Sequence, residues 1–596
     1  MKLSRPVRVL AALLIAGVCA TGCVSMPTGG PVQSYPVTQA ADAQNQPYVQ
    51  VVPQSPGTNW RPAQIVQGFL TASASFGNYS QVALEYLTSA ARAGWKPSWS
   101  AIVYKAGPNV TSPSYPSGTV KNAQTATVQI TGTVQANLQG GYGSYSVPSA
   151  AGSAPSSDPQ PVFKLVKVGG QWRIAEAPSE FLLTSDSFKN DYQLSKLYFL
   201  NPDGNALVPD PVYVPVTASL PELMNGLVSD LITAPTDWLG GATKTAFPAG
   251  TKIRGVSLNG VTAVVNLTGA AMVKASADNG VMQQISAQLF NTLYSVAQTS
   301  SSGQAVQSIQ VEVNGTPWVP PNGQNSAVQQ SSQVKPAAGA SSVFYYVTKA
   351  GSLFSQNVTE TQPARVAQLG TGVTQIAVSP DGSFLAALRG STLYTGVLGG
   401  TLAKRGTGYT SISWDVNDDL WAAQGSQIQM FRSAVGQRQV LGDVVQVNVV
   451  NPYSFENPNA TLSLLRVAPD GVRVAIVIGG TTLAYGAISG QDGANPQITL
   501  SPVQEQSVNA TTFTSLTWYG SDDVITLSNP GSAVTEYPVS GGSATSISSD
   551  FGMESITASS GSPLVASLSN GDLVSDVSPQ GAWMTITDGS SPAYPG

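Results

Sequence analysis

Histidine is absent from this sequence of 596 residues, and cysteine occurs only at Cys19 and Cys23. The first absence excludes imidazole acid-base chemistry, Ser-His-Asp and Cys-His nucleophiles, and HExxH zinc sites. The second leaves the chain after Cys23 without an internal disulfide or a thiolate metal cluster. We therefore expect a protein that is not an enzyme and that has no catalytic residue, no metal site and no cofactor.

Charge is also scarce, because only 10% of the residues are charged and 27 Lys and Arg face 32 Asp and Glu. The pI of about 4.9 leaves no basic stripe that could neutralise phosphates, so no nucleic-acid partner is expected. The 59 glycines and 41 prolines are typical of many short strands and turns. The length predicts three or four domains.

The first 22 residues have the pattern of a signal peptide. Lys2, Arg5 and Arg8 precede the apolar segment 9–18, which is too short to span a bilayer comfortably. The small residues 20–22 before Cys23 are similar to a bacterial lipobox, although Ala20 stands where Leu is usual. The sequence predicts lipidation of Cys23 as the first mature residue, with an ordinary secretory signal as the alternative.

Residues 23–58 are rich in proline and have no hydrophobic periodicity, which predicts an extended lipidated tether. In 59–190, apolar residues at helical spacing come first, among them Ile65, Phe69 and Phe76. Strand-like segments follow at 126–134, 162–168 and 171–174. This order predicts an α+β domain and resembles the cone-shaped NTF2-like fold.

Residues 191–318 predict a second α+β domain. Ser219 and Glu222 form a capping box, and Leu223, Leu227 and Leu231 lie on one face of the helix that follows. The segments 247–251, 264–268 and 311–315 resemble turns and strands of the GerMN sporulation and germination domain. That resemblance implies an interaction domain of the bacterial envelope. Residues 319–340, which begin with a Pro-Pro pair, are expected to be a linker.

An internal repeat occupies 341–596. Equivalent apolar anchors lie at Ile376, Ile412, Leu465, Leu516 and Ile556. Their spacings of 36, 53, 51 and 40 residues are close to the roughly 40–50 residues of a four-stranded propeller blade. The repeat predicts an all-β propeller of five to seven blades. We expect the segment 343–347 to close the ring with strands near the C-terminus.

The clustered acids of this repeat have two interpretations. Asp418 and Asp419 recur as Asp522 and Asp523 at the equivalent position of another copy, and Pro-Asp-Gly occurs twice, at 380–382 and 469–471. Such acids build turns by bonding nearby backbone amides, which is the interpretation that recurrence favours. The alternative is a calcium site or a glycosidase carboxylate pair.

A lipobox, an NTF2-like unit, a GerMN-like unit and a propeller together resemble the actinobacterial LpqB lipoprotein family over essentially the whole chain. The resemblance implies a palmitate-bearing lipoprotein held by Cys23 on the extracytoplasmic face of the cell membrane. It further implies an accessory of the MtrA/MtrB two-component system that binds the extracytoplasmic part of the sensor kinase MtrB and influences cell-wall homeostasis and division.

The alternative function is an envelope glycan-binding or glycan-hydrolysing protein. It would use propeller carboxylates and exposed aromatic residues such as Trp414 and Trp518, although their recurrence favours packing between blades. Ser332 and Lys335 form the one SxxK pattern that we find, without the companion motifs of penicillin-binding enzymes. We interpret it as chance.

Overall fold

The computed structural model describes residues 53–596 with short gaps. Not described are 75–79, 96–99, 117–121, 140–143, 147–159, 216–219, 300–305, 322–325, 330–333, 338, 359–361, 434–440, 451–459, 492, 494, 507–511, 530–532, 541–543 and 577–581. The predicted signal peptide, Cys23 and most of the tether therefore lie outside the described residues, as do Phe76, Ser219 and Ser332. Residues 49–596 form one compact unit.

The first region is α+β, with its helices ahead of its sheet, as the sequence predicts. Its elements are α2 (Pro62–Ala74), α3 (Ser80–Glu85), α4 (Ser89–Gly94), β1 (Ala101–Val110), β2 (Thr125–Gln139), β3 (Ser144–Ser146), β4 (Val162–Val168), β5 (Gln171–Glu176), β6 (Phe181–Thr184) and α5 (Ser185–Asp191). The main sheet runs β5-β4-β2-β1-β6. Phe69 of α2 makes an edge contact with Phe163 of β4, so the apolar face of the helix packs on the sheet.

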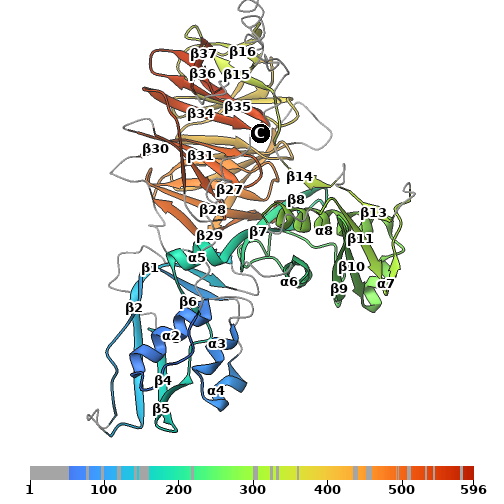
Figure 1. Ribbon diagram of the computed structural model, residues 1–596. Coiled ribbons are helices and arrows are strands. Elements are labelled where there is room, and N and C mark those ends of the chain that lie inside the picture. Colours follow the sequence, from blue (N-terminus) through green and yellow to red (C-terminus); the bar gives the residue numbers. More distant parts are fainter. Residues whose placement is uncertain are drawn as a thin grey trace, which may run out of the picture. The chain divides into compact units, whose positions relative to one another are not determined.

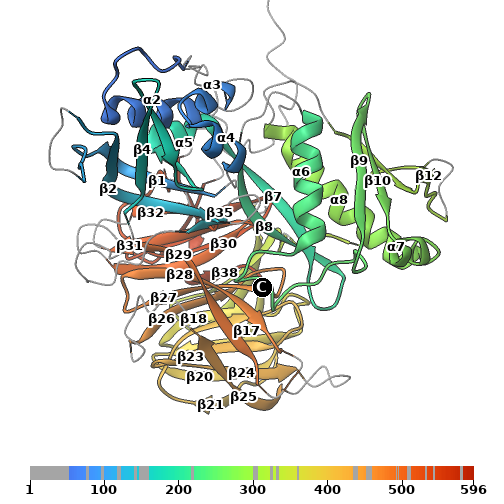
Figure 2. The same ribbon diagram turned by 90° about the horizontal axis from the view of Figure 1, so that it is seen from below.

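The second region is also α+β. Its elements are β7 (Tyr192–Leu200), β8 (Ala206–Pro215), α6 (Leu220–Thr233), β9 (Lys252–Asn259), β10 (Thr262–Thr268), α7 (Ala270–Ala275), α8 (Asn279–Thr299), β11 (Ser308–Val313), β12 (Thr316–Pro317), β13 (Ala327–Val328) and β14 (Lys335–Pro336). Leu223, Leu227 and Leu231 of α6 are all buried, as their spacing predicts. Helices α6 and α8 pack against the sheet β12-β11-β10-β9 (Figure 2).

The segment expected to be a linker takes part in both sheets of this region. Val328 of β13 pairs with Ile309 of β11, and Lys335 of β14 pairs in parallel with Ala206 of β8. Two short stretches of backbone pairing therefore hold the chain against the second region before it enters the third.

The third region is all-β (Figure 1). Its strands are β15 (Val343–Val347), β16 (Ser352–Asn357), β17 (Ala364–Gln368), β18 (Val373–Val378), β19 (Phe384–Arg389), β20 (Thr392–Val397), β21 (Ala403–Gly406), β22 (Tyr409–Trp414), β23 (Leu420–Gln424), β24 (Gln427–Ser433), β25 (Leu441–Val450), β26 (Leu462–Val467), β27 (Arg473–Ile478), β28 (Thr482–Ser489), β29 (Gln497–Gln506), β30 (Thr512–Tyr519), β31 (Asp523–Asn529), β32 (Ala533–Pro538), β33 (Thr545–Ile547), β34 (Met553–Ser559), β35 (Ser562–Leu568), β36 (Asp572–Ser575), β37 (Met584–Asp588) and β38 (Ser590–Ala593).

Within the described residues these strands form six four-stranded blades. Five blades are consecutive in the chain, and each begins with its inner strand: β18, β22, β26, β30 or β34. The outer strands β25 and β29 also pair in parallel, which joins two neighbouring blades into one eight-stranded sheet. The five repeat anchors predicted from the sequence all lie on these five inner strands.

The remaining blade closes the ring. Its inner strand is β38 from the C-terminus, which pairs with β15 at Tyr345↔Ala593 and Val347↔Ser590. The inner strands touch in an unbroken cycle, β18-β22-β26-β30-β34-β38 and back to β18. The prediction that 343–347 closes the propeller with C-terminal strands is therefore confirmed.

Candidate functional site

The first acid pair lies in the turn between β22 and β23, where Asp415 organises the backbone. The Asp415 carboxylate accepts hydrogen bonds from the amides of Asn417 at 2.9 Å and Asp419 at 3.0 Å, and from Trp421 Nε1 at 2.8 Å. Asp418 adopts a positive φ of 60°, and Asp419 Oδ1 accepts the amide of Ser433 at 2.6 Å. Asp418 and Asp419 thus lie in a turn whose amides are bonded by Asp415, while their own carboxylates accept amides of more distant residues, Asp381 for Asp418 and Ser433 for Asp419.

The turn acids of the two Pro-Asp-Gly copies have the same function. Asp381 accepts the amide of Ser383 at 2.7 Å, and Asp470 accepts the amide of Val472 at 2.8 Å. Partial burial alone would raise the pKa of Asp381, but hydrogen bonds from Ser383 and its neighbours hold it below the ordinary value. Both carboxylates are therefore engaged by the turns that they build.

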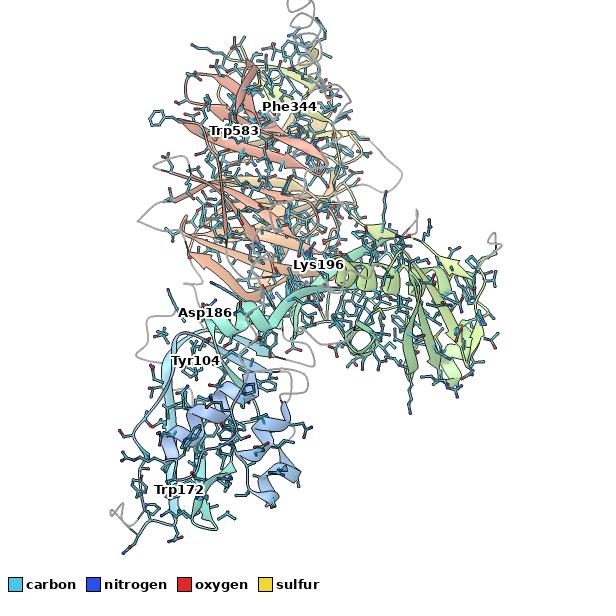
Figure 3. All side chains as sticks on the ribbon, viewed as in Figure 1. Tyr104, Trp172, Asp186, Lys196, Phe344 and Trp583 are labelled. Carbon is cyan, nitrogen blue, oxygen red and sulfur yellow. The ribbon has the colours of Figure 1, made fainter. Side chains whose placement is uncertain are left out.

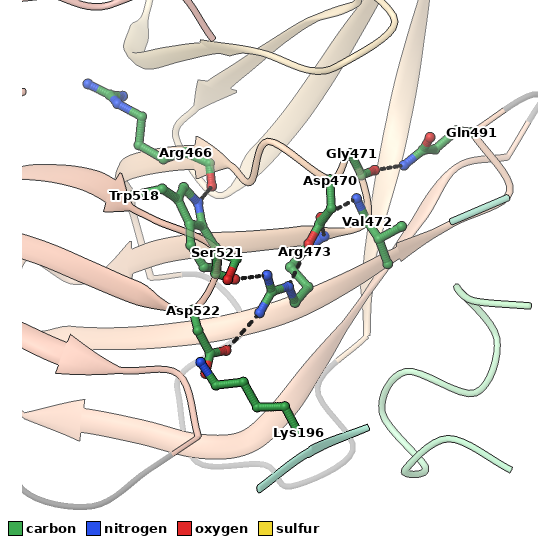
Figure 4. A network of polar contacts seen from close by, with 10 residues as sticks. All are labelled: Lys196, Arg466, Asp470, Gly471, Val472, Arg473, Gln491, Trp518, Ser521 and Asp522. Carbon is green, nitrogen blue, oxygen red and sulfur yellow. Dashed lines mark hydrogen bonds and ion pairs between the residues drawn. The ribbon is translucent and has the colours of Figure 1, made fainter. Parts of the chain in front are cut away.

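The second acid pair does not repeat the first, which corrects the expectation that both pairs only build turns. Asp522 Oδ1 lies 3.1 Å from Arg473 Nη1, and Asp522 Oδ2 lies 3.1 Å from Lys196 Nζ (Figure 4). Arg473 also pairs through Nε with Asp470 Oδ2 at 2.7 Å and donates to the carbonyl of Ser521. We call Lys196, Asp470, Arg473 and Asp522 the charge network.

Three of the four side chains in the charge network are almost fully buried, and the fourth, Lys196, is 26% exposed. The Arg473 side chain is 2% exposed, and those of Asp470 and Asp522 are 1% and 3% exposed. Burial opposes the charge on Arg473, but the two carboxylates outweigh it and raise the pKa of Arg473 above its ordinary value. Two cations thus face two carboxylates in a compensated buried cluster, the arrangement that a buried charge requires.

Lys196, labelled in Figure 3, brings the second region into this network, because it belongs to β7 while its partner Asp522 belongs to the propeller. Apolar residues continue the contact: Val208 and Leu239 share one buried cluster with Val472 and Ala487 of the propeller. Trp238 packs against the same cluster. The junction is therefore a small hydrophobic core with a compensated ion network beside it.

Two further carboxyls near this junction have raised pKa values. Burial raises the pKa of Asp210 on β8 to about 7, although its carboxylate accepts Thr236 N at 2.7 Å and Thr236 Oγ1 at 2.8 Å. Burial and the neighbouring charge of Asp522 also raise the pKa of Asp523. Perturbed carboxyls can mark a functional site, but here burial at a junction accounts for the shift.

Sequence reasoning missed the charge network. Its signal is Arg473, the one charged residue in the strand Arg473–Ile478, whose residues are all buried. A charge at a buried position must have a partner, so this residue alone predicts a buried acid nearby. Nothing local to Lys196 or Asp522 indicates that they meet across more than 300 residues of sequence.

The two tryptophans proposed as exposed glycan-binding residues are buried between blades. Trp414 Nε1 donates to the carbonyl of Ala377 on the preceding inner strand at 3.0 Å, and Trp518 Nε1 donates to the carbonyl of Arg466 at 3.0 Å. Their exposed fractions are 1% and 7%. These residues are thus structural, as their recurrence favours, and offer no platform on which a sugar could stack.

The described residues contain neither a metal-binding cluster nor a membrane-spanning helix. Within them, no cluster of three or more Asp, Glu, Cys or His residues is arranged to hold a metal ion. No helix in this part of the chain is both long and apolar enough to cross a membrane.

Three family models match this chain in succession. They are described as "Lipoprotein LpqB, N-terminal domain" over 55–189, "Sporulation and spore germination" over 196–318, and "Lipoprotein LpqB beta-propeller domain" over 351–595. The propeller domain of Cps50 (Swd1) from Myceliophteria thermophila covers 39% of this chain and 94% of its own, at 11% identity and a TM-score of 0.27. That score carries no weight, so the propeller assignment rests on the family match and the closed ring of strands.

Full-length relatives agree with these matches. Lipoprotein LpqB of Thermobifida fusca is 29% identical, with 99% of each chain covered. Lipoprotein LpqB of Mycobacterium bovis is 24% identical, with 96% of this chain and 94% of the relative covered. The class defined by fold and matches is a multidomain envelope lipoprotein with a C-terminal propeller. The chain belongs to the actinobacterial LpqB lipoprotein family.

Proposed function

We propose that this lipoprotein is a non-catalytic accessory of the MtrA/MtrB two-component system, anchored through lipid on Cys23 to the extracytoplasmic face of the cell membrane. It binds the extracytoplasmic part of the sensor kinase MtrB and thereby influences cell-wall homeostasis and division. The partner comes from the family resemblance, and the structure supports the non-catalytic part of the proposal.

One observation carries that part: in each of the two acid pairs that the sequence offers for chemistry, one carboxylate is engaged in a structural contact. Asp419 and Asp470 hold backbone amides, and Asp522 is paired with two cations. A glycosidase needs a carboxyl pair that faces the glycosidic bond, one to donate a proton and one to attack or to activate water. Carboxylates held by amides and ion pairs are poorly suited to either role.

The architecture also supports a binding role. A closed propeller presents loops from a rigid ring, and loops on a rigid scaffold are where proteins place recognition residues. The junction at the charge network ties the second region to that ring, so the two can present their loops together.

Co-purification from membranes tests the proposal. MtrB should be recovered from detergent-solubilised membranes with the tagged full-length lipoprotein, and recovery should fall at least tenfold with Cys23→Ser, which loses the shared membrane surface. A tagged unrelated lipoprotein with its own anchor is the matched control. Equal recovery of MtrB with that control would contradict the proposal.

A further inference from the structure

Arg466 is an unusual residue for its place in the propeller. It lies on the inner strand β26, and only one other charged residue, Glu554, occurs on the six inner strands β18, β22, β26, β30, β34 and β38. The side chain of Arg466 is half-buried, so a small solute can still reach it. Figure 4 shows its guanidinium pointing away from Arg473 and from the charge network.

All hydrogen-bond acceptors of Arg466 are uncharged. Nη1 donates to Leu465 O at 2.7 Å, Ile412 O at 3.0 Å and Ser411 Oγ at 3.1 Å. Within the described part of the chain, Arg466 has no carboxylate partner, and its Nε and Nη2 donate no hydrogen bond. Burial lowers the pKa of Arg466 to about 10, with no acid to oppose the shift. Arg473, by contrast, faces two carboxylates.

A guanidinium remains protonated at neutral pH, and at this partly shielded position it loses part of its hydration without gaining a countercharge. Charges that lose hydration in proteins are normally paired. The Nε and Nη2 donors of a guanidinium match the two oxygens of a carboxylate or phosphate. Both the missing countercharge and the free donors therefore point to an anion.

The internal repeat shows that the fold does not need a cation here. Ala377 occupies the position equivalent to Arg466 in another blade, and the carbonyl of each accepts a hydrogen bond from the inner-strand tryptophan of the next blade. The backbone role of the position is thus shared by both residues. Nη1 of the guanidinium also joins β26 to β22 through Ile412 O and Ser411 Oγ, but Nε and Nη2 take no part in that contact between blades.

We propose that Arg466 forms a binding site for a small oxyanion, a free carboxylate or phosphate, between the inner strands β22 and β26. The anion accepts hydrogen bonds from Nε and Nη2 while Nη1 stays anchored to Ile412 O and Ser411 Oγ. This site is independent of the proposed partner, and it adds a small-molecule ligand to a protein otherwise described only as binding protein and membrane.

Thermal unfolding of the full mature chain carrying Cys23→Ser tests the proposal. Inorganic phosphate and acetate are titrated separately against chloride at constant ionic strength, so that charge screening is the same throughout. Exclusion of phosphate from the protein surface also raises the Tm, so binding is read as the part of the rise that an Arg466 variant loses. A ligand that binds only the folded state raises the Tm progressively with its concentration. We expect a rise of at least 3 °C with phosphate or acetate, and whichever anion gives the larger rise identifies the preferred group.

Arg466→Ala introduces the residue that occupies the equivalent position 377 in another blade. It should abolish the part of the rise in Tm that binding causes. Arg466→Gln keeps a neutral amide NH₂ group as a hydrogen-bond donor without the charge, and it gives the same test if the alanine variant is too unstable. Arg254→Ala, at an exposed position of β9, should keep the full rise as the matched control. Equal rises in wild type and Arg466→Gln, or no rise with either anion in wild type, would overturn the proposal.

Discussion

Removing the guanidinium from the charge network should destabilise the propeller strongly. Arg473→Met retains much of the side-chain volume but leaves Asp470 and Asp522 without the cation that lies 2.7 and 3.1 Å from their oxygens. Breaking a buried ion pair from one side costs about 3–5 kcal/mol, because the remaining charge is uncompensated. Asp522 keeps Lys196, and Asp470 keeps the amide of Val472, so we expect the lower end, about 3 kcal/mol.

Thermal unfolding followed by near-UV circular dichroism measures this loss. For a domain of this size, 1 kcal/mol shifts the Tm by about 2–4 °C, so the variant should melt roughly 6–12 °C lower. Trp518 adds a local signal, because the Arg473 guanidinium lies 5.2 Å from its ring centroid. Arg254→Met on exposed β9 is the control and should change stability by less than about 0.5 kcal/mol.

A compensating variant separates lost charge balance from lost packing. Arg473→Met combined with Lys196→Met, Asp470→Asn and Asp522→Asn removes both cations and both carboxylates of the charge network. It should recover part of the lost stability, since neutral replacement of a buried ion cluster is often tolerated. A loss below about 1 kcal/mol for Arg473→Met alone, or a combined variant less stable than the single one, would refute this account of the charge network.

Three further predictions concern other parts of the molecule. Burial raises the pKa of Asp210 to about 7, so the folded state binds a proton that the unfolded chain releases near pH 4. The free energy of unfolding should therefore fall as pH rises from 4 to 7. In melting curves recorded across this pH range, Asp210→Asn should make that fall smaller. Cys23→Ser should move the protein from the membrane to the soluble fraction on immunoblots, and retained detergent-dependent membrane association would indicate another anchor. Deleting Ser590–Ala593 removes an inner strand, so it should lower the single cooperative melt of the whole propeller in calorimetry; loss of one blade-sized transition alone would count against ring closure.

Periodicity and repetition made much of the fold predictable. The propeller follows from anchors that recur at blade spacing, because every blade repeats the same inner strand and turn. The closing blade does not follow the repeat pattern. It combines the first three strands of the propeller, β15, β16 and β17, with the last strand, β38. The turn acids were predictable for the same reason: Asp381 and Asp470 occupy the same place in two copies.

Contacts between distant segments were not predictable in the same way. Lys196 and Asp522 meet because β7 lies against the propeller, and no local pattern encodes that approach. Asp522 and Asp419 illustrate the limit, since similar acid pairs at equivalent repeat positions serve an ion network in one blade and a hydrogen bond to the backbone of a later strand in another. The unpaired Arg466 was equally hidden, because an absent partner becomes visible only once the surroundings are placed.

The most direct test of a non-catalytic sensor-binding lipoprotein is the affinity of its mature, lipid-free chain for the purified extracytoplasmic part of MtrB. Biolayer interferometry should give saturable binding, and Asp418→Asn with Asp419→Asn should leave the Kd unchanged within twofold. Asn keeps a side-chain oxygen that can still accept the amides of Asp381 and Ser433. No binding to MtrB, together with hydrolysis of cell-wall glycan that the same substitutions abolish in a folded protein, would contradict the account.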